Sequence, residues 1–551
     1  MRGVICFLYF LLLASLSAYT HPVNNPVKNY NVEWCDQFKW NNVISIDMVQ
    51  GSSLNERFNK AQEALHMQGG GVVYFPPGEY VFDDHLLVKS GIVVRGSDPV
   101  NTEKWNPIVP GDIPQAFTDA REPRYTLGTI FYFPKYEMVN KTGKFECADE
   151  AFKGIRAHDP DDAEYIAVIN LDIRNGHISI GNRHALQRNY SAGNMKGHVV
   201  VFGNILINTG VPLKIPVPGK EHIEQIWLNR EFGAISVFAC KNVLVANNRI
   251  PEYDKDNFII EEYCLFPTRQ NYQERINMVK KDVPFDYQNR TGIRVNFMPV
   301  LPELTIWSIH EELQKAVEDG TYEELVTPGT LAKGIVIRNN YVFSSGGGGI
   351  KTTGDGAWIA FNIVKSSHSV ELVTANGRFM DSHVNDVRAI EVRGWRWTVE
   401  SNIFDIHSNY TPEGIKYNDG EGIMHESWEN VDVRDSRIIN NIGNQYICLW
   451  RVPVRGLEIS GNLMRIKPAW HAIFVNNQTR FTPQQLEDLP FERVVIDNNT
   501  TEGGGIKTLG SKGYGNYIRN NRHTLINEGK IENFTGSEMS GNVNYLYVLP
   551  D

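Results

Sequence analysis

The chain has 551 residues, of which 42% are hydrophobic and 21% are charged, so one elongated domain or two or three compact ones are equally admissible. Its formal net charge of −10 at pH 7 makes nucleic acid a poor partner. An acidic polysaccharide is compatible with this charge, because an acidic protein can carry a local basic cleft.

The N-terminal residues have the pattern of a secretory signal peptide. Arg2 precedes an apolar run from Val4 to Leu16, and small residues up to Ala18 follow, as expected before a cleavage site. We therefore predict a signal peptide over residues 1–18 and a secreted or periplasmic protein over residues 19–551. The later sequence lacks a run of about 18 apolar residues, so we expect no membrane span.

Residues 53–67 are predicted to form an amphipathic helix. Ser53 and Glu56 have the spacing of a capping box at its start. Apolar residues then recur at helical spacing: Leu54, Phe58, Ala61 and Leu65. We expect this helix to cap the first coil of a solenoid.

The segment that follows the helix is GGGVVYFPPGEYVFDDHLLVKSGIVVRGS, residues 69–97. It resembles the N-terminal module of the rhamnogalacturonase and epimerase type in the pectate-lyase-like superfamily. That module has a capping helix, a Gly-Gly-x-Val-x-Phe-Pro-Pro-Gly-x-Tyr segment and a strand ending in Arg-Gly. The resemblance implies a right-handed parallel β-helix and, usually, action on a polysaccharide. It does not choose between lyase, hydrolase and epimerase.

A six-residue pattern recurs along the chain: apolar, any, apolar, any, any, Asn. It ends at these positions, with Ser replacing Asn once: Asn204, Asn248, Asn340, Asn362, Asn402, Ser436, Asn462 and Asn499. Short β-branched strands at intervals of a coil, with Asn at the turns, are typical of a parallel β-helix. Asn suits such turns because it tolerates left-handed geometry and can hydrogen-bond to the next coil.

These observations predict an all-β protein, a right-handed single-stranded parallel β-helix with an N-terminal capping helix. The alternative is an antiparallel sandwich, which would need two-residue hairpin signals between strands. The segment between Asn248 and Asn340 is much longer than one coil and includes a helical pattern over residues 305–320. We predict a partly helical insertion over residues 251–333, which either walls one side of a groove or contacts a partner chain.

The turn residues also predict a column of ionisable side chains. Strands of successive coils lie about 4.8 Å apart, so residues equally distant from the turns should stack. Eleven residues before four of the turn residues stand Lys351, Glu391, His425 and Arg451. The residues one position earlier are apolar, so alternation directs the ionisable column outward, and Arg393 extends the polar stripe. The alternative is a solvated face whose charges pair sideways.

Further residues complete the candidate site. Glu426 falls at an inward position by the same count, where an unpaired carboxylate is costly, so either it has a partner or the register slips. The predicted substrate-binding residues are Trp395, Trp428, Asp355, His383 and Arg455. The polygalacturonase signature is missing, with residues 354–356 as its nearest fragment, and residues 451–455 are one residue short of an Arg-x-Pro-x-x-Arg motif of one pectate lyase family.

Two chemistries fit this column. β-Elimination from a uronic acid needs a base, which Lys351 or His425 could supply, and a cation that neutralises the carboxylate, for which Arg393 or Arg451 would serve. Calcium is the alternative cation, with Asp419, Glu421 and Asp386 as its candidate ligands, although no EF-hand-like run is present.

Hydrolysis instead needs two carboxylates, about 5–9.5 Å apart, for which the candidate pairs are Glu391 with Glu426 and Asp355 with Glu391. We favour elimination, because basic residues outnumber carboxylates in the column. The third hypothesis is a glycan-binding or adhesive solenoid without catalysis.

Overall fold

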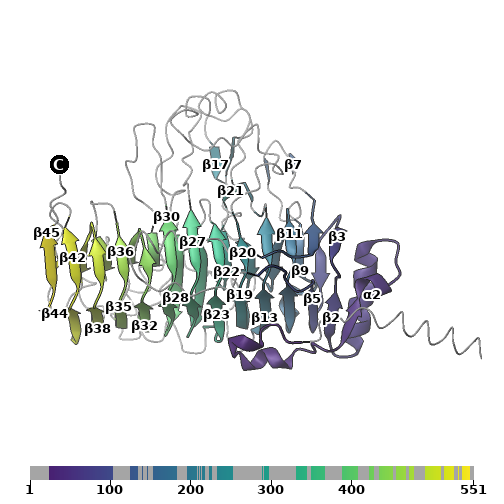
Figure 1. Cartoon of the computed structure of the whole chain (residues 1–551), viewed down its shortest axis with the longest axis horizontal. Helices are drawn as coiled ribbons and strands as arrows, with labels where there is room; N and C mark the ends of the chain where they lie inside the picture. The colour runs from purple at the N-terminus through teal and green to yellow at the C-terminus, as the bar shows by residue number, and fades with distance from the viewer. Residues whose placement is uncertain are drawn as a thin grey trace, which may run out of the picture.

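The computed structural model describes residues 24–551 apart from 103–124, 135–138, 141–144, 147–152, 183–194, 208, 210, 213, 217–222, 226–232, 252–287, 290, 297–330, 344–348, 367–387, 407–420, 427–432, 451–453, 467–470, 477–490, 510–513, 526–530, 533–536 and 547–551. Its strands stand side by side in a long row that starts beside the helix α2 (Leu54–Met67) and ends at β45 (Val543–Leu546) (Figure 1). The protein is a parallel β-helix, as predicted.

From β4 (Leu86–Val88) onward, each coil contributes one strand to each of three columns, which we call A, B and C in chain order, and β1 to β3 precede the first complete coil. Column A contains β4 (Leu86–Val88), β9 (Gly154–Ala157), β12 (His177–Ile180), β18 (Gly233–Val237), β22 (Thr291–Val295), β25 (Ile350–Asp355), β28 (Arg388–Trp395), β31 (Glu421–Glu426), β34 (Tyr446–Trp450), β37 (His471–Asn476), β40 (Gly505–Leu509) and β43 (Ile531–Glu532). The strands are parallel, and this column carries most of the predicted site residues.

Columns B and C complete each coil. Column B contains β1 (Val43–Ser45), β2 (Gly71–Tyr74), β5 (Ile92–Arg95), β10 (Ile166–Ile169), β13 (Lys196–Phe202), β19 (Cys240–Ala246), β23 (Ile335–Arg338), β26 (Trp358–Ala360), β29 (Thr398–Glu400), β32 (Val433–Ile439), β35 (Val454–Ser460), β38 (Phe491–Asp497), β41 (Asn516–Arg519) and β44 (Ser537–Ser540). Column C contains β3 (Gly78–Val81), β6 (Thr129–Tyr132), β11 (Asp172–Arg174), β14 (Ile205–Ile207), β20 (Arg249–Ile250), β24 (Tyr341–Phe343), β27 (Ile363–Ser366), β30 (Ile403–Ile406), β33 (Ile442–Gly443), β36 (Leu463–Arg465), β39 (Thr500–Glu502), β42 (Arg522–Leu525) and β45.

An isoleucine column sets the register of column A. Every strand of column A from β9 to β43 carries an isoleucine at one register: Ile155, Ile178, Ile235, Ile293, Ile350, Ile390, Ile423, Ile447, Ile473, Ile506 and Ile531. The isoleucines whose side chains are described are fully buried in the main core. The preceding residue is often small, because a Cβ at Gly349 would lie 2.2 Å from Val364 Cγ1. Small-Ile-x is therefore the sequence signature of column A.

An asparagine ladder runs along the turns between columns B and C. Its members are Asn204, Asn248, Asn340, Asn362, Asn402, Asn441, Asn462, Asn499, Asn521 and Asn542. Each Oδ1 after the first accepts from both the backbone N–H and the side-chain amide of the preceding member, as Asn402 does from Asn362 at 3.0 and 2.9 Å. The prediction of Ser436 as a turn residue is wrong, since Asn441 occupies that rung and Ser436 lies within β32.

Substituting one rung should destabilise the solenoid. Asn402→Ala removes an acceptor from Asn362 and leaves the Ile359 carbonyl, which accepts from Asn402 at 3.0 Å, without that donor. Because unsatisfied buried polar groups cost about 1–3 kcal/mol each, we expect the free energy of unfolding to fall by about 2–3 kcal/mol. Urea unfolding followed by circular dichroism measures this change, and an unchanged midpoint would contradict the structural role of the ladder.

The predicted capping helix is present as α2. The Ser53 side chain accepts a hydrogen bond from the Glu56 amide, while Glu56 Oε2 accepts from the Ser52 amide at 2.8 Å instead of closing the box on Ser53. Phe58, Ala61 and Leu65 are buried against the first coils. Helix α2 therefore covers the apolar end of the solenoid, as Figure 1 shows.

The predicted insertion over residues 251–333 contains a strand of the solenoid. The strand β22 pairs in parallel with β18 and β25, so it belongs to column A. Most of the remaining residues of that range, including the helical pattern over 305–320, lie outside the described residues. In the described part of the chain, none of the helices has the length and apolar character needed to cross a membrane.

Candidate functional site

A charged cluster lies on column A, at the position that follows the isoleucine column. The register aligns Arg294, Lys351 and Glu391 on β22, β25 and β28. Arg388 and Arg393, also on β28, complete what we call the cationic cluster. Because alternate side chains of a strand point to opposite faces, this position lies on the outer face of the sheet. The predicted stacking of Lys351 on Glu391 is confirmed.

Glu391 is the centre of the cationic cluster. Its Oε1 accepts from Arg393 Nη2 at 2.7 Å and lies 2.9 Å from Arg388 Nη1, and its Oε2 lies 3.1 Å from Lys351 Nζ. The Glu391 side chain is fully buried, whereas 16% of the Lys351 side chain is exposed. The cluster is therefore a compact polar site with Lys351 partly open to solvent. The column was predicted to face outward, but Glu391 is buried there among its cations, and the alternative of a solvated face does not describe it either.

The two central groups have shifted pKa values. Burial lowers the pKa of the Lys351 ammonium, and the neighbouring Glu391 offsets only part of this effect. Burial alone would raise the pKa of the Glu391 carboxyl, but Arg388, Lys351 and Arg393 together hold it well below its usual value. Lys351 is therefore easier to deprotonate than an ordinary lysine, and Glu391 stays ionised.

The predicted extension of the column to His425 is wrong. Glu391 pairs with Met424, and His425 pairs with Leu449, one position further along the strand. Leu449 is fully buried in the core, so the backbone register places His425 in line with a core residue. The count failed because it started from Ser436, which is not a ladder residue. The isoleucine column, which passes through Ile423, carries the correct register.

Glu426 also departs from its predicted position. It pairs with Trp450, two residues beyond the Met424 register, so its backbone position has the outward parity of Glu391. The shift in strand register that was left open for Glu426 from the sequence therefore occurs. The structure describes only the backbone of β31, so the roles of His425 and Glu426 stay predictions.

A second row of residues follows the junction of columns A and B. Parallel pairings align Lys333, Asp355, Trp395, Arg434 and Arg455 across successive coils. The Trp395 side chain is 1% exposed, and the guanidinium carbon of Arg434 lies 4.1 Å from its ring centroid. Stacking of Trp395 on a sugar, as predicted, would need Arg434 to move away from the ring.

Asp355 is buried and held by cations. Arg396 bonds to its Oδ2, and Lys333 Nζ lies 3.9 Å from the same oxygen. Asp355 stands four residues beyond Lys351, the partner of Glu391, so the backbone positions of Asp355 and Glu391 are roughly 13 Å apart along the strands, and each carboxylate is held by different cations. The pair of Asp355 with Glu391 is therefore too wide for hydrolysis, since the usual separation does not exceed about 9.5 Å.

Several predicted site residues lie outside the described residues: Arg451, Trp428, His383, Asp386 and Asp419. Glu421, the third candidate calcium ligand, is described only through its backbone, which pairs with Arg388. Among the described side chains, no group of three or more His, Cys, Asp or Glu residues is placed to hold a metal ion. Arg455 lies on β35, and its carbonyl accepts from Arg493 at 2.8 Å.

Arg294 and Arg388 belong to the cluster but were not predicted from the sequence. Arg294 follows an isoleucine in a Gly-Ile-Arg triplet on β22, inside the range that was assigned to the insertion. Alignment on Small-Ile-x would have placed it directly beside Lys351. Arg388 lies three residues before Glu391 in the same strand, and the sequence holds no signal that would direct it to that carboxylate.

Comparison with known proteins gives distant structural likenesses. No protein-family model matches the chain, and no curated protein has a significantly similar sequence. The surface protein and adhesin PfbA of Streptococcus pneumoniae is 11% identical, with a TM-score of 0.39 over 91% of this chain and 100% of PfbA. The catalytic unit of a GH87 α-1,3-glucanase from Streptomyces thermodiastaticus is 10% identical, with a TM-score of 0.41 over 92% of this chain and 70% of that one.

A further similar structure is the A-module of the mannuronan C-5 epimerase AlgE6 of Azotobacter vinelandii. It is 10% identical, with a TM-score of 0.31 over 92% of this chain and 100% of the module. The structural neighbours thus include carbohydrate-active enzymes and an adhesin. Structural similarities at 10–11% sequence identity do not identify an activity of this chain.

Proposed function

We propose that this protein is a secreted or periplasmic enzyme that cleaves a uronic-acid-containing polysaccharide by β-elimination at the cationic cluster. Lys351 removes the proton from the carbon that bears the substrate carboxylate, and Arg393 with Arg388 neutralises that carboxylate. A carbon–carbon double bond forms as the glycosidic carbon–oxygen bond at the β position breaks, and the leaving oxygen takes up a proton from solvent. The observation that carries the proposal is the Lys351–Glu391–Arg393 arrangement, in which burial lowers the pKa of a partly exposed lysine beside two arginines.

This arrangement matches the needs of elimination. The base must lose its proton, and burial lowers the pKa of Lys351, so this amine is easier to deprotonate than that of an ordinary lysine. The substrate carboxylate must be neutralised so that the adjacent proton becomes acidic, and arginine binds a carboxylate through two parallel hydrogen bonds. Among the described side chains, the cluster contains four cations, Arg294, Lys351, Arg388 and Arg393, and cations are the groups that bind an anionic substrate.

Hydrolysis receives less support from the same residues. A glycosidase acid needs a carboxyl group with a raised pKa, whereas three cations hold the pKa of Glu391 well below its usual value. Asp355 is too far from Glu391 to form a catalytic pair. Within the described side chains, the cluster thus lacks the carboxyl pair that hydrolysis would use.

Binding of an acidic glycan without cleavage is the second candidate function. It is favoured by the full burial of Glu391 and by its contacts with three cations. Such an ion-pair network is a stable arrangement that is accounted for by a binding role without catalysis. Such a protein would hold a uronate or sulfate group at the cluster and release it unchanged.

An assay on the purified protein distinguishes these functions. The chain is incubated with a panel of acidic and neutral polysaccharides, and both near-ultraviolet absorbance and reducing ends are measured. Elimination produces an unsaturated uronate that raises both signals, hydrolysis raises only the reducing ends, and a binding protein raises neither while it retains the glycan. The proposal fails if no uronic-acid polysaccharide in the panel gives an unsaturated product.

A further inference from the structure

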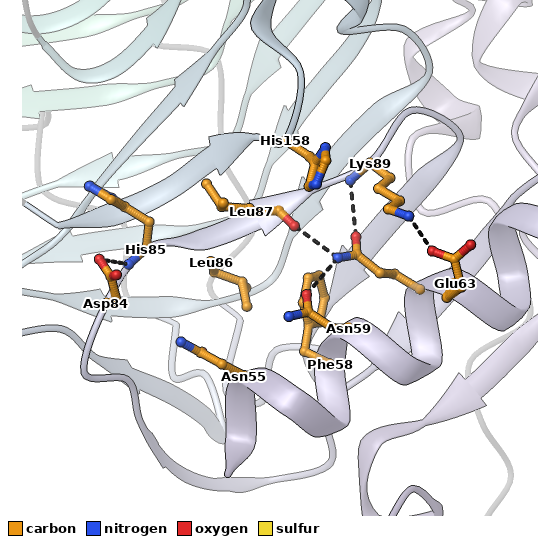
Figure 2. A pocket seen from close by; sticks show the side chains of 11 residues that line it. Asn55, Phe58, Asn59, Glu63, Asp84, His85, Leu86, Leu87, Lys89 and His158 are labelled. Carbon is orange, nitrogen blue, oxygen red and sulfur yellow. Dashed lines mark hydrogen bonds and ion pairs between the residues drawn. The ribbon is translucent and has the colours of Figure 1, made fainter. Parts of the chain in front are cut away.

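A pocket of about 370 Å³ lies at the N-terminal end of the solenoid, between α2 and β4. Figure 2 shows side chains from one face of the helix, among them Asn55, Asn59 and Glu63, opposite the strand segment that carries His85 and Leu87. This volume is at the lower end of the range of small-molecule sites, which is about 300–1,000 Å³. The pocket can therefore hold a small ligand of one or two rings.

A buried glutamine holds the walls of the pocket together. Gln62 Nε2 donates to Leu87 O at 3.0 Å and to Asn59 Oδ1 at 2.9 Å, and Gln62 Oε1 accepts from the Lys89 amide at 3.0 Å. Gln62 thereby joins α2 to β4 and sets the orientation of Asn59. The Nδ2 of Asn59 is then the group that this side chain can offer to a ligand.

The pocket contains both neutral donors and a neutral acceptor. His85 Nδ1 accepts from the Gly154 amide at 3.2 Å, so the hydrogen of its neutral ring is on Nε2, which can donate. Burial, together with Arg156 and Lys153, lowers the pKa of His85 to about 4, which keeps the ring neutral at pH 7. Among the described atoms, Asn55 Oδ1 is a buried acceptor that has no hydrogen-bond partner.

Three charged residues that line the pocket, Glu63, Lys89 and Asp84, have ion-pair partners. Lys89 contacts Glu63, and Lys153 Nζ lies 2.7 Å from Asp84 Oδ1. An ionic ligand would have to compete with these pairs, whereas a neutral polar ligand would not. The Leu87 side chain is 39% exposed and adds an apolar surface at the rim.

We propose that this pocket binds one neutral sugar unit of a glycan, separately from the cationic cluster. A pyranose ring has hydroxyl groups that both donate and accept, which fits Asn55, Asn59 and His85, and a C–H face that fits Leu87. Such a site goes beyond the proposed elimination, because it binds an uncharged sugar and takes no part in cleavage of the glycan.

The position of the pocket relates it to the cationic cluster. Leu87 belongs to the same outward row as Lys351, through the pairings Leu87–Arg156, Arg156–Ser179, Ser179–Ser236, Ser236–Arg294 and Arg294–Lys351. Five strand spacings of about 4.8 Å separate the two residues by about 24 Å. Between them in this row, Ser179 and Ser236 are 8% and 0% exposed, so the pocket and the cationic cluster are two separate sites.

The test uses the full chain and the methyl glycosides of glucose, galactose and mannose, with galacturonate and glucuronate as charged probes. Saturation-transfer NMR and calorimetry measure binding to the wild type, to Asn55→Leu and to His85→Phe. We expect at least one neutral glycoside to bind saturably, and each substitution to raise its Kd about tenfold, as the loss of one good hydrogen bond would. Lys60→Ala, at an exposed position of α2 outside the pocket, should leave the Kd unchanged.

Three results would overturn the proposal. The first is that no neutral glycoside binds saturably, and the second is that both folded pocket variants bind it with the same Kd as the wild type. The third is that the uronates bind more tightly than the neutral glycosides and that the pocket variants abolish this binding. Thermal melting establishes that each variant is folded, and two variants are used so that the loss of one still leaves a test. Lys351→Met should not change this binding, so a failure of the elimination proposal is distinguishable from a failure of the sugar pocket.

Discussion

Replacing Lys351 with Met is expected to lower kcat on a uronic-acid polysaccharide by about 100-fold or more, because a positioned base contributes roughly 10²–10⁴ to the rate. Met keeps most of the length of the side chain and removes the amine that lies 3.1 Å from Glu391. Formation of the unsaturated product, followed by near-ultraviolet absorbance, measures the effect.

Lys507 supplies a matched control for this substitution. It follows Ile506 in another Gly-Ile-Lys triplet and lies at the same register of column A, beside Phe474 and outside the cationic cluster. Lys507→Met should retain the wild-type rate. Equal rates for wild type and folded Lys351→Met would rule out Lys351 as the base, even with cleavage established.

The pH dependence of cleavage provides a separate prediction. A base acts when it is deprotonated, so kcat/KM should rise with pH through the pKa of Lys351, which burial places below the ordinary value of 10.5. Glu391 opposes this shift, so Glu391→Gln should move the rise to lower pH. A pH–rate profile of both proteins measures the two values. A rise at the same pH in both would contradict the coupling of Lys351 to Glu391.

Glu391→Gln is also expected to reduce the free energy of unfolding by about 3–5 kcal/mol at pH 7, the usual cost of removing one partner of a buried ion pair. Three cations lie within 3.1 Å of the Glu391 oxygens, and the substitution leaves their charges without this carboxylate. Urea unfolding measures the loss. Glu458→Gln is the control, because the Glu458–Arg437 pair at 2.8 Å is substantially exposed and should contribute less than about 1 kcal/mol.

The stability effect of Glu391 should depend on pH with a defined sign. The folded-state pKa of Glu391 lies well below 4.5, its ordinary value in an unfolded chain, so the folded protein binds its proton less readily. The stability that this carboxylate contributes is fully present above pH 4.5 and is lost as the pH falls toward the folded pKa. The difference between wild type and Glu391→Gln should therefore shrink below pH 4.5. A constant difference from pH 7 to pH 3 would contradict this linkage.

The repeating units were predictable from the sequence because each coil repeats the same local requirement. Asn at the turn between columns B and C satisfies two donors of the neighbouring rung, so it recurs as in Asn362 and Asn402. The capping helix was predictable for the same kind of reason, since Ser53 and the apolar face of α2 form local patterns. The sequence thus determines that the chain is a capped β-helix and that Lys351 and Glu391 are neighbours.

The register of β31 was decided only by the tertiary structure. The connections between successive strands differ in length. The number of residues in a connection therefore does not determine which residues of the two strands pair. The backbone of Ile390 pairs with that of Ile423, so Met424 and not His425 adjoins Glu391. The burial of side chains was also decided by the tertiary structure. Arg388 and Arg393 contact Glu391 and stabilise its charge in the interior, and Arg434 covers the ring of Trp395. Sequence distance carries no information on such contacts, because they depend on which side chains from separate coils share one space.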